Sequence, residues 1–421
     1  MTLSACWVAC RLTWACAGVC FVVIGGVGFM SGHLKFTGSF LWRDSPAGDT
    51  GNGNDGGSGK ALLPATWVDG SLYVHHGVVS RHPEAGLTYR EIRGWAVPGL
   101  VDVHCHVGLG SSGPVDRDTQ EAQARADRDV GVLLIRDCGA PVDTRWINEH
   151  PELPRIIHCG AHLARPKRYL RYFGLELENP HDLPAEVARQ TARGDGWVKI
   201  VGDWIDRADG ADSDLRPLWD GRILRDAVQA AHEHGARVTV HTFARATIDD
   251  LLDAGVDCIE HGTGMDSDHI AEAARRGIPV TPTMLQIARF ADFAAQAGAK
   301  YPVYAATMSA MHQRNIEHQA SLLAAGVQLL PGTDAGGYQA HGSLPTELAR
   351  WLNLGLRPAE IVDLATWRAR DFLGVPVLSE GAPADLVVYP CDPRADIAVL
   401  ARPALVVLRG EPVAGARVTE L

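Results

Sequence analysis

Residues 98–106 read PGLVDVHCH, and they restrict the fold of this chain more than any other stretch. With a Pro-Gly turn at its start, the apolar set Val97, Leu100, Val101 and Val103 predicts a short buried strand. Side chains alternate between the two faces of a strand, so His104 and His106 project to the same side at its carboxyl end. At a rise of about 3.3 Å per residue, the two imidazoles lie about 7 Å apart along the strand. They can therefore converge on one metal ion.

Beyond Pro98, short apolar strands alternate with amphipathic helices. The expected strands are Leu100–His104, Val132–Asp137, Arg155–His158, Trp197–Val201, Arg237–His241, Cys258–His261, Pro279–Thr283 and Gln328–Thr333. The helical segments between them include 220–235, 246–254, 268–277 and 312–325. Strands that alternate with helices form a parallel sheet, and eight such units favour closure into a barrel. The sequence therefore predicts the α/β class, with a (β/α)8 TIM-type barrel.

Candidate metal ligands stand at the ends of several predicted strands. Active sites of such barrels form at the carboxyl ends of the strands, so these side chains are expected to meet. WVKIV carries Lys199, VTVHTF carries His241, CIEHGTG carries His261, and PGTDAGG carries Asp334. With the two histidines of PGLVDVHCH, this set predicts a metal centre.

These motifs resemble those of the amidohydrolase superfamily, and most closely its imidazolonepropionase-like and prolidase-like branch. The resemblance runs from about Leu72 to the C-terminus and rests on PGLVDVHCH, WVKI, VHTFARATIDDLLDAGVDCIEHGT, PGTDAGG and EGAPADLVVYPCDP. It implies a (β/α)8 barrel with a small β-sandwich side domain formed from both termini. We therefore expect residues 66–97 and 376–421 to form the side domain, and residues 98–375 to form a metal-dependent hydrolase barrel.

The resemblance also implies two divalent ions bridged by a carboxylated lysine. One ion would be held by His104, His106 and Asp334, the other by His241 and His261, and both by Lys199. A lysine amine inside a barrel is costly unless it is paired or neutral, and a free amine can capture CO2. A second interpretation stays open, in which Lys199 forms an ion pair with Asp334 or Asp203 over a single metal. Zinc is the expected ion, with Mn, Co and Fe as alternatives.

The implied reaction is metal-assisted hydrolysis of an amide, peptide-like or similar C–N bond. The metal would acidify water and so supply hydroxide near neutral pH. Asp334 would take the proton of the attacking water and pass it to the leaving nitrogen, while His241 or His261 would help to polarise the carbonyl. We expect a small substrate such as a dipeptide or an N-acyl amino acid. The alternatives are a mononuclear cyclic-amide hydrolase or deaminase, and a non-catalytic scaffold relative.

Weaker candidates for substrate binding lie at the ends of the second and third strands and in the loops after the third and eighth. A planar guanidinium suits bidentate recognition of a substrate carboxylate. Each candidate also has a competing structural interpretation. Arg136 would pair with Asp137, the loop that contains Arg165, Tyr169 and Tyr172 would be a solvated basic loop, and His341 would pack within its loop. The candidates are Arg136, His158, Arg165, Tyr169, Tyr172 and His341.

Charge and cysteine content restrict the partners and the compartment. The net charge of −11 makes a nucleic acid an unsuitable partner. The cysteines do not suggest a disulfide framework, which favours a reducing compartment, and we expect the cytoplasm. The expected partner is a small-molecule amide substrate. We also expect a homo-oligomer, of a state that the sequence does not define.

The N-terminal residues allow three interpretations. Residues 12–30 contain no charged residue and are about long enough to cross a bilayer. These residues form a membrane anchor, form a signal sequence, or result from a misassigned start codon upstream of the true initiator Met30. We favour the misassigned start. Membrane anchoring through residues 12–30 is thus the alternative to a cytoplasmic location. We expect residues 1–30 to be a hydrophobic segment and residues 31–65 a flexible Gly-rich region.

Overall fold

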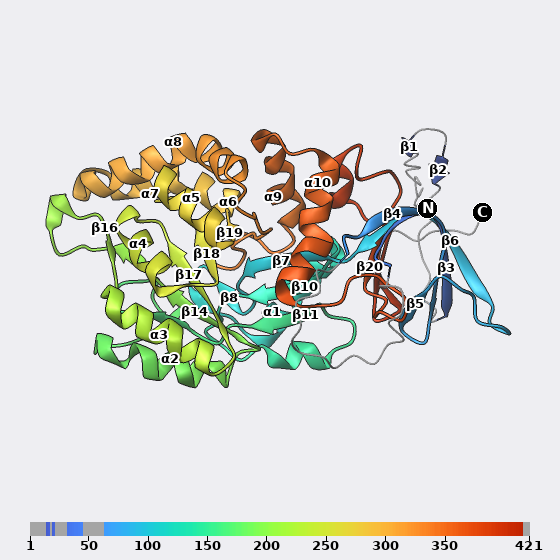
Figure 1. The fold of residues 1–421 in the computed structure, drawn as a ribbon, viewed down its shortest axis with the longest axis horizontal. Helices are drawn as coiled ribbons and strands as arrows, with labels where there is room; N and C mark the ends of the chain where they lie inside the picture. Colours follow the sequence, from blue (N-terminus) through green and yellow to red (C-terminus); the bar gives the residue numbers. More distant parts are fainter. Residues whose placement is uncertain (1–13, 17–18, 22–31, 45–62, 416–421) are drawn as a thin grey trace, which may run out of the picture. The chain divides into compact units, whose positions relative to one another are not determined.

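The structure is a computed structural model that describes residues 14–16, 19–21, 32–44 and 63–415. The chain divides into two compact units. One consists of Met1–Pro98 with Pro376–Leu421, and the other of Gly99–Val375. Figure 1 shows the helices and strands of both.

The unit Gly99–Val375 is built on parallel strands separated by helices. Its parallel strands are β7 (Leu100–Cys105), β10 (Val132–Asp137), β11 (Arg155–His158), β12 (His162–Ala164), β13 (Gly174–Glu176), β14 (Trp197–Val201), β17 (Arg237–Thr242), β18 (Cys258–His261) and β19 (Val280–Thr281). They pair in the orders β11-β10-β7 and β13-β12-β14-β17-β18-β19. Every residue of β7, β10, β14 and β18 is buried, as expected for strands covered on both faces.

Helices cover these strands. They are α1 (Arg117–Asp129), α2 (Leu183–Thr191), α3 (Gly221–Glu233), α4 (Arg245–Ala254), α5 (Ser267–Arg276), α6 (Met284–Ala288), α7 (Phe290–Ala297), α8 (Pro302–Ala324), α9 (Leu344–Arg350), α10 (Pro358–Asp363) and α11 (Ala369–Leu373). In Figure 1, α7 and α8 lie on one side of β14, β17 and β18, and α2 and α3 lie on the other. Asp116, Asp220 and Asp266 cap the starts of α1, α3 and α5 with their side chains.

Shorter elements complete this unit. Two of them are antiparallel strand pairs, β8 (Leu109–Gly110) with β9 (Gly113–Pro114) and β15 (Asp203–Ile205) with β16 (Leu215–Pro217). The others are the short 3-10 helices η1 (Arg145–Glu149), η2 (Pro180–Asp182), η3 (Gly210–Asp212), η4 (Gly298–Lys300) and η5 (Trp351–Leu354), and the π-helix η6 (Leu364–Arg368). The expected strand Gln328–Thr333 is reduced to a single bridge between Leu329 and Val280.

The other unit contains one seven-stranded sheet to which both ends of the chain contribute. Its strands are β3 (His33–Trp42), β4 (Thr66–His75), β5 (Val78–Ser80), β6 (Tyr89–Pro98), β20 (Leu386–Tyr389), β21 (Leu405–Leu408) and β22 (Glu411–Ala414), with the turn η7 at Ile397–Ala401. The order is β22-β21-β20-β6-β3-β4-β5, and only β3 and β6 are parallel. Apolar side chains from both ends of the chain, including Leu34, Phe36, Ile92, Leu386 and Val407, form its core.

This unit differs from expectation in three respects. Residues 33–42 form β3 in the middle of the sheet and not part of a flexible region, because alternate side chains such as Leu34 and Phe36 are buried in the core. The described residues of this unit form one sheet besides the small hairpin of β1 (Trp14–Cys16) and β2 (Val19–Phe21), and not two sheets of a sandwich. Cys391 forms a disulfide, which the cysteine pattern did not suggest.

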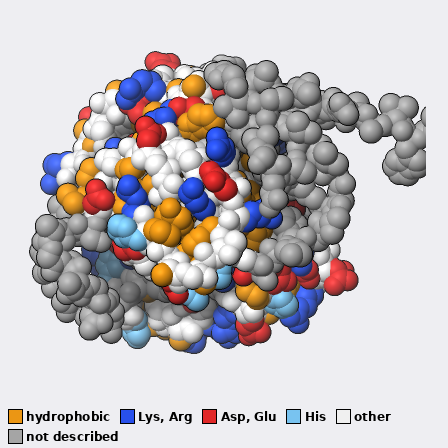
Figure 2. Space-filling view, turned by 90° about the vertical axis from the view of Figure 1, so that its right-hand side faces the viewer, with side chains coloured by type: hydrophobic (Ala, Val, Ile, Leu, Met, Phe, Trp, Pro, Cys, Tyr) orange, Lys and Arg blue, Asp and Glu red, His pale blue; other side chains and the backbone are white. Residues whose placement is uncertain are grey.

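The apolar stretch 12–30 lies mostly outside the described residues. Within the part that is described, no helix has the length and apolar composition needed to cross a bilayer. On the face drawn in Figure 2, acidic and basic side chains of the described residues are interspersed and do not gather by sign.

Candidate active site

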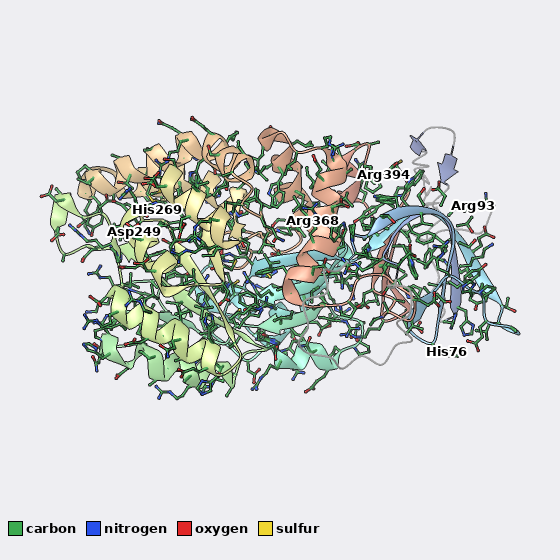
Figure 3. All side chains as sticks on the ribbon, in the orientation of Figure 1. His76, Arg93, Asp249, His269, Arg368 and Arg394 are labelled. Atoms are coloured by element: carbon green, nitrogen blue, oxygen red, sulfur yellow. The ribbon has the colours of Figure 1, made fainter. Side chains whose placement is uncertain are left out.

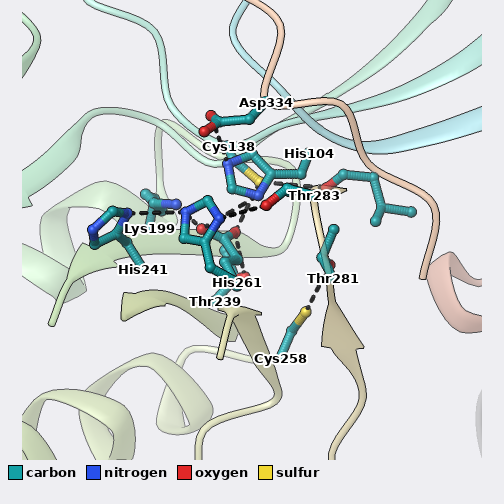
Figure 4. Close-up of polar contacts among 12 residues, drawn as sticks. His104, Cys138, Lys199, Thr239, His241, Cys258, His261, Thr281, Thr283 and Asp334 are labelled. Atoms are coloured by element: carbon teal, nitrogen blue, oxygen red, sulfur yellow. Dashed lines mark hydrogen bonds and ion pairs between the residues drawn. The ribbon is translucent and has the colours of Figure 1, made fainter. Parts of the chain in front are cut away.

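The six predicted ligands come from five separate segments of the chain, and the structure brings them together. Figure 4 shows five of them: His104, Lys199, His241, His261 and Asp334. Asp334 Oδ1 lies 3.2 Å from His104 Nε2 and 3.0 Å from His106 Nε2. On the facing strands, His241 Nδ1 lies 3.0 Å from His261 Nε2. The rings of His104 and His261 are 5.1 Å apart, so the two groups adjoin.

Hydrogen bonds behind the rings fix which nitrogen faces the site. His106 Nδ1 lies 2.9 Å from the carbonyl oxygen of Gly139, and His261 Nδ1 lies 2.7 Å from Thr283 Oγ1. Each bond occupies the outer nitrogen and leaves Nε2 directed at the other ligands. Such outer partners orient a metal-binding imidazole and set its tautomer.

Backbone conformation explains how His261 reaches the site. Strand alternation places Cys258 and Glu260 on one face of β18 and would place His261 on the other. His261 instead has φ = 66°, and Asp334 has φ = 57°, both in the left-handed region. These turns at the strand ends bring the imidazole and the carboxylate inward, at a cost that the surrounding structure must offset.

Glu260 is the principal site residue that the sequence interpretation missed. Its side chain is buried and forms an ion pair with Lys199. Glu260 Oε1 also accepts hydrogen bonds from Thr239 (2.6 Å) and Cys138 (3.0 Å), and lies 3.7 Å from Arg136 Nη2. The alternative interpretation, in which Lys199 pairs with Asp334 or Asp203, was therefore wrong about the partner, which is Glu260.

Asp203, one of the two partners considered for Lys199, is used elsewhere. It accepts hydrogen bonds from the backbone N–H groups of Phe243 (2.9 Å) and Ala244 (3.0 Å) and from the hydroxyl of Thr242. It therefore holds the segment that follows His241 at the start of α4.

A signal for Glu260 was present in the sequence. Leu134, Trp197 and Cys258 belong to one apolar cluster. The residues two positions later on the same strand faces are Arg136, Lys199 and Glu260, and all three are fully buried. A layer of charged side chains thus follows a layer of apolar ones, and two cations in that layer require an anion.

Burial makes the histidines suitable for a metal. Burial lowers the pKa of His104 and His241 well below the ordinary value, and it lowers the pKa of His261 to about 3. These rings are therefore neutral at pH 7 and can donate lone pairs. Burial also lowers the pKa of Lys199, which favours the free amine. Burial opposes ionisation of Asp334, but the neighbouring His104 and His106 hold the pKa of Asp334 well below its usual range.

The spacing of these atoms fits shared metal ions. Two ligands on one zinc lie about 3.3 Å apart when each bond is about 2.0 Å long and the angle is tetrahedral. The separations of 3.0 to 3.2 Å in the structure are close to that value. His104, His261 and Asp334 offer ligand atoms that all lie within 4.8 Å of one another. The donor set of neutral imidazoles and a carboxylate is one that divalent zinc, manganese, cobalt or iron accepts.

A cavity of about 280 Å³ opens onto these ligands, and aromatic side chains form much of its wall. His106, His241 and Asp334 lie in the wall. Among the described residues, Arg207 is the only Lys or Arg side chain that lines the cavity. The aromatic residues of the wall are Tyr169, Phe173, Trp204, Phe243, Phe293, Tyr301, Tyr304 and Tyr338.

Of the candidates for substrate binding, Tyr169 lines the cavity, with its ring 5.7 Å from that of His241. Arg136 does not, because it is buried in the charged layer, where it donates to the carbonyl of Val103 and stacks on Trp197. His158 is bound by Asp195 at 2.7 Å. Both contacts are structural.

The remaining candidates do not line the cavity either. Arg165 donates to the backbone carbonyls of Leu177 and Glu178. Tyr172 is 75% exposed and does not line the cavity. His341 Nδ1 lies 2.7 Å from Asp127, which joins the loop after Asp334 to α1. Loop residues at these positions were not distinguishable by sequence, because the direction of each side chain depends on tertiary contacts.

His162 is a second residue that the sequence interpretation missed. It is fully buried, its ring lies 4.8 Å from that of His106, and neither of its ring nitrogens has a hydrogen-bond partner among the described residues. Burial lowers the pKa of His162 well below the ordinary value. A buried imidazole without partners is costly, so the ring is available to a bound molecule.

Comparison with known proteins agrees with this geometry. Residues 95–413 match the sequence profile of the amidohydrolase family. Two uncharacterized mycobacterial proteins, Rv2915c of Mycobacterium tuberculosis and Mb2939c of Mycobacterium bovis, are 48% identical to this chain over 339 residues. That match covers 80% of this chain and 90% of theirs.

Solved structures share the fold at low sequence identity. A Xaa-Pro dipeptidase with bound methionine matches 90% of this chain and 99% of its own, with a TM-score of 0.71 and 19% identity. An Aspergillus niger ochratoxinase matches 91% of this chain and 96% of its own, with a TM-score of 0.69 and 18% identity. These similarities imply a TIM-barrel-type fold with a side domain.

Proposed function

The chain belongs to the amidohydrolase family and is a hydrolase acting on carbon–nitrogen bonds, and from this premise we propose that it hydrolyses a small amide at the six-ligand centre. The observation that carries the proposal is the approach of Asp334 to both histidines of PGLVDVHCH, at 3.2 and 3.0 Å. A scaffold relative would have no need to keep a costly cluster of buried neutral histidines around a carboxylate.

We propose that Asp334 is the proton carrier. The low pKa of Asp334 keeps it ionised at neutral pH, so it can accept the proton of the attacking water. It then delivers the proton to the leaving nitrogen. We propose that His162, whose two ring nitrogens have no hydrogen-bond partner among the described residues, donates a hydrogen bond to the substrate carbonyl. Divalent ions, when bound, supply Lewis acidity and lower the pKa of water.

We propose two zinc ions, held by His104, His106 and Asp334 and by His241 and His261, with carboxylated Lys199 between them. The lowered pKa of Lys199 supports capture of CO2 by the amine. Glu260 competes with this chemistry because it pairs with the ammonium form. Protein loaded with ¹³C-bicarbonate is expected to show a carbamate carbon by NMR that Lys199→Met lacks. Two zinc ions per site support the bridge, and one ion without a carbamate supports the mononuclear alternative.

The lining of the cavity supports a proposal for the substrate class. Its aromatic wall suits an apolar or aromatic side group, and the guanidinium of Arg207 suits a carboxylate. We therefore propose an N-acyl amino acid or dipeptide with a bulky apolar group. One protein of similar fold is a prolidase whose structure was solved in complex with N-methylphosphonate-L-proline.

We also propose that the parallel strands close into a (β/α)8 barrel. Support comes from the segment 328–331, whose residues bond to strands at both ends of the series. Leu330 N donates to the carbonyl of Val280 at 2.9 Å, and Val103 N donates to the carbonyl of Pro331 at 2.8 Å. These bonds join β19 to β7 through the eighth segment.

The test is hydrolysis of a panel of dipeptides, N-acyl amino acids and lactams by zinc-reconstituted protein. We expect turnover of acyclic amides with apolar groups, and a loss of about 10²- to 10⁴-fold in kcat for Asp334→Asn. Turnover of lactams or amidines alone would favour the cyclic-amide hydrolase or deaminase. Wild-type protein that binds zinc but is as inactive as Asp334→Asn on all substrates would favour the scaffold.

A further inference from the structure

Two histidines and a glutamate converge in the seven-stranded sheet unit, and none of them is one of the six ligands of the candidate active site. We propose that His75, His76 and Glu84 form a second binding site for a divalent transition-metal ion such as Zn²⁺. One carboxylate oxygen, Glu84 Oε2, lies 3.3 Å from His75 Nδ1 and 3.1 Å from His76 Nε2. The three ligand atoms all lie within 4.8 Å of one another. This proposal does not depend on the proposed hydrolase activity.

The spacing is that of ligands around one ion. Ligands on a tetrahedral zinc lie about 3.3 Å apart, and both measured separations are within a few tenths of an ångström of this value. Two imidazoles and one carboxylate form a frequent three-ligand set for zinc, and the fourth position remains open to water. The side chains of His76 and Glu84 are 63% and 45% exposed, so an ion can enter from solvent.

His75 provides an independent indication. Its side chain is 14% exposed, but Nδ1 itself is buried and has no hydrogen-bond partner among the described residues. The contact of 3.3 Å with Glu84 is therefore not a hydrogen bond, and Nδ1 remains desolvated and without one. A buried polar atom in this state costs free energy. A bond from Nδ1 to a metal would remove that cost.

The backbone directs His76 toward the same point. His76 and Gly77 are the two-residue turn between β4 and β5, and Figure 3 labels His76 at this turn. Their φ angles are 51° and 78°. Two positive φ angles in a two-residue turn are typical of Asn-Gly, and His is another residue that adopts the left-handed region. The turn holds the His76 ring beside the carboxylate, with Nε2 3.1 Å from Glu84 Oε2.

Glu84 is fixed in the loop between β5 and β6. Its backbone N–H donates to the hydroxyl of Tyr89 at 2.8 Å. A metal held by all three residues would therefore tie the β4–β5 turn to this loop. We expect the ion to stabilise this edge of the sheet, because the turn and the loop would no longer separate freely.

The test is a zinc titration of the full-length, tag-free protein after metal removal, in competition with a chromogenic chelator. The variants are His76→Asn and Glu84→Gln. Asn suits the left-handed turn, so the hairpin is kept, and Gln is isosteric but a weaker ligand. We expect each variant to lose one zinc equivalent per chain, or to bind it at least tenfold more weakly, while the other equivalents are unchanged.

His82→Asn is the matched control, because His82 is an exposed histidine of the same loop that does not belong to the cluster. It should bind zinc as the wild type does. Circular dichroism of the metal-free variants shows whether they are folded, and so distinguishes a folding defect from the loss of a metal ligand. A second readout, the visible absorption of Co²⁺ bound to wild-type protein, should include a component that Glu84→Gln lacks. Equal zinc stoichiometry and affinity in the wild type and both variants would overturn the proposal.

Discussion

Three residues of the active site have a left-handed backbone conformation. His261, Thr283 and Asp334 have φ angles of 66°, 43° and 57°. Such a conformation is a genuine outlier for a β-branched residue such as Thr283, and it costs about 1–3 kcal/mol. The contact it achieves is the hydrogen bond of 2.7 Å between Thr283 Oγ1 and His261 Nδ1. The strain is thus tied to the orientation of a metal ligand.

Removal of that hydroxyl should weaken metal binding. We expect Thr283→Ala to lower zinc affinity by about 10- to 100-fold, because His261 loses the partner that fixes its ring. Thr283→Ser keeps the hydroxyl and is the control, with affinity near that of the wild type. Chelator competition measures both. Equal affinities in Thr283→Ala and Thr283→Ser would show that the hydroxyl has no part in orienting the ring.

Arg207 gives a second prediction at this scale, about substrate choice. If it binds a substrate carboxylate, Arg207→Met should raise KM for N-acyl amino acids by about tenfold or more and leave KM for the matching neutral amides unchanged. Arg207→Lys should keep part of the effect, because the charge remains without the planar fork. An equal rise in KM for charged and neutral substrates would assign Arg207 to the shape of the cavity.

At the scale of elements, α9 supports the site through α6. Glu347 of α9 accepts hydrogen bonds of 2.8 Å from the backbone N–H groups of both Met284 and Leu285, at the start of α6. Thr283, which contacts His261, directly precedes this helix. A buried carboxylate is costly, and burial raises the pKa of Glu347 to about 7. The helix start that holds a ligand partner thus depends on one carboxyl group.

The raised pKa of Glu347 predicts a pH effect on stability. The native state holds the proton more firmly than the unfolded chain, so the contribution is fully present below pH 4.5 and is lost as pH rises through about 7. Between these limits, wild-type stability should fall by on the order of 3 kcal/mol relative to Glu347→Gln. Urea unfolding of both proteins at pH 5 and pH 7.5 measures the difference. Parallel stability curves would contradict the raised pKa.

At the scale of the whole molecule, metal and folding are linked. The candidate ligands come from five segments of the chain, and those on β7, β14, β17 and β18 depend on the pairing of strands that are far apart in sequence. An ion that binds only the folded form stabilises it by about 4 kcal/mol when its concentration is 1,000 times Kd. The unit Gly99–Val375 should therefore depend on its metal for part of its stability.

Chelation should lower the thermal midpoint of unfolding, and zinc should restore it. The experiment is best done in the Glu84→Gln background, so that the site proposed at His75 and His76 does not contribute. When Asp334→Asn is added to Glu84→Gln, chelation should shift the thermal midpoint less than it does in Glu84→Gln alone, because one ion loses a ligand. A midpoint that chelation leaves unchanged would exclude a tightly bound metal in the folded protein.

The sequence by itself determined the family, most strand positions and the set of candidate ligands. Strands such as Val132–Asp137 and Trp197–Val201 have the bounds that their apolar runs predict. These features are readable because strand periodicity and apolar runs are local properties of the chain. The match of residues 95–413 to the amidohydrolase family confirms the predicted resemblance.

Only the tertiary structure decided which polar side chains meet. The pairing of Lys199 with Glu260, the approach of His162 to His106, and the structural contacts of Arg165 all join segments that lie apart in the sequence. His261 reaches the site through a positive φ angle that strand alternation does not predict. Periodicity gives the face of a regular strand, but strand ends and loops take their directions from packing against distant residues.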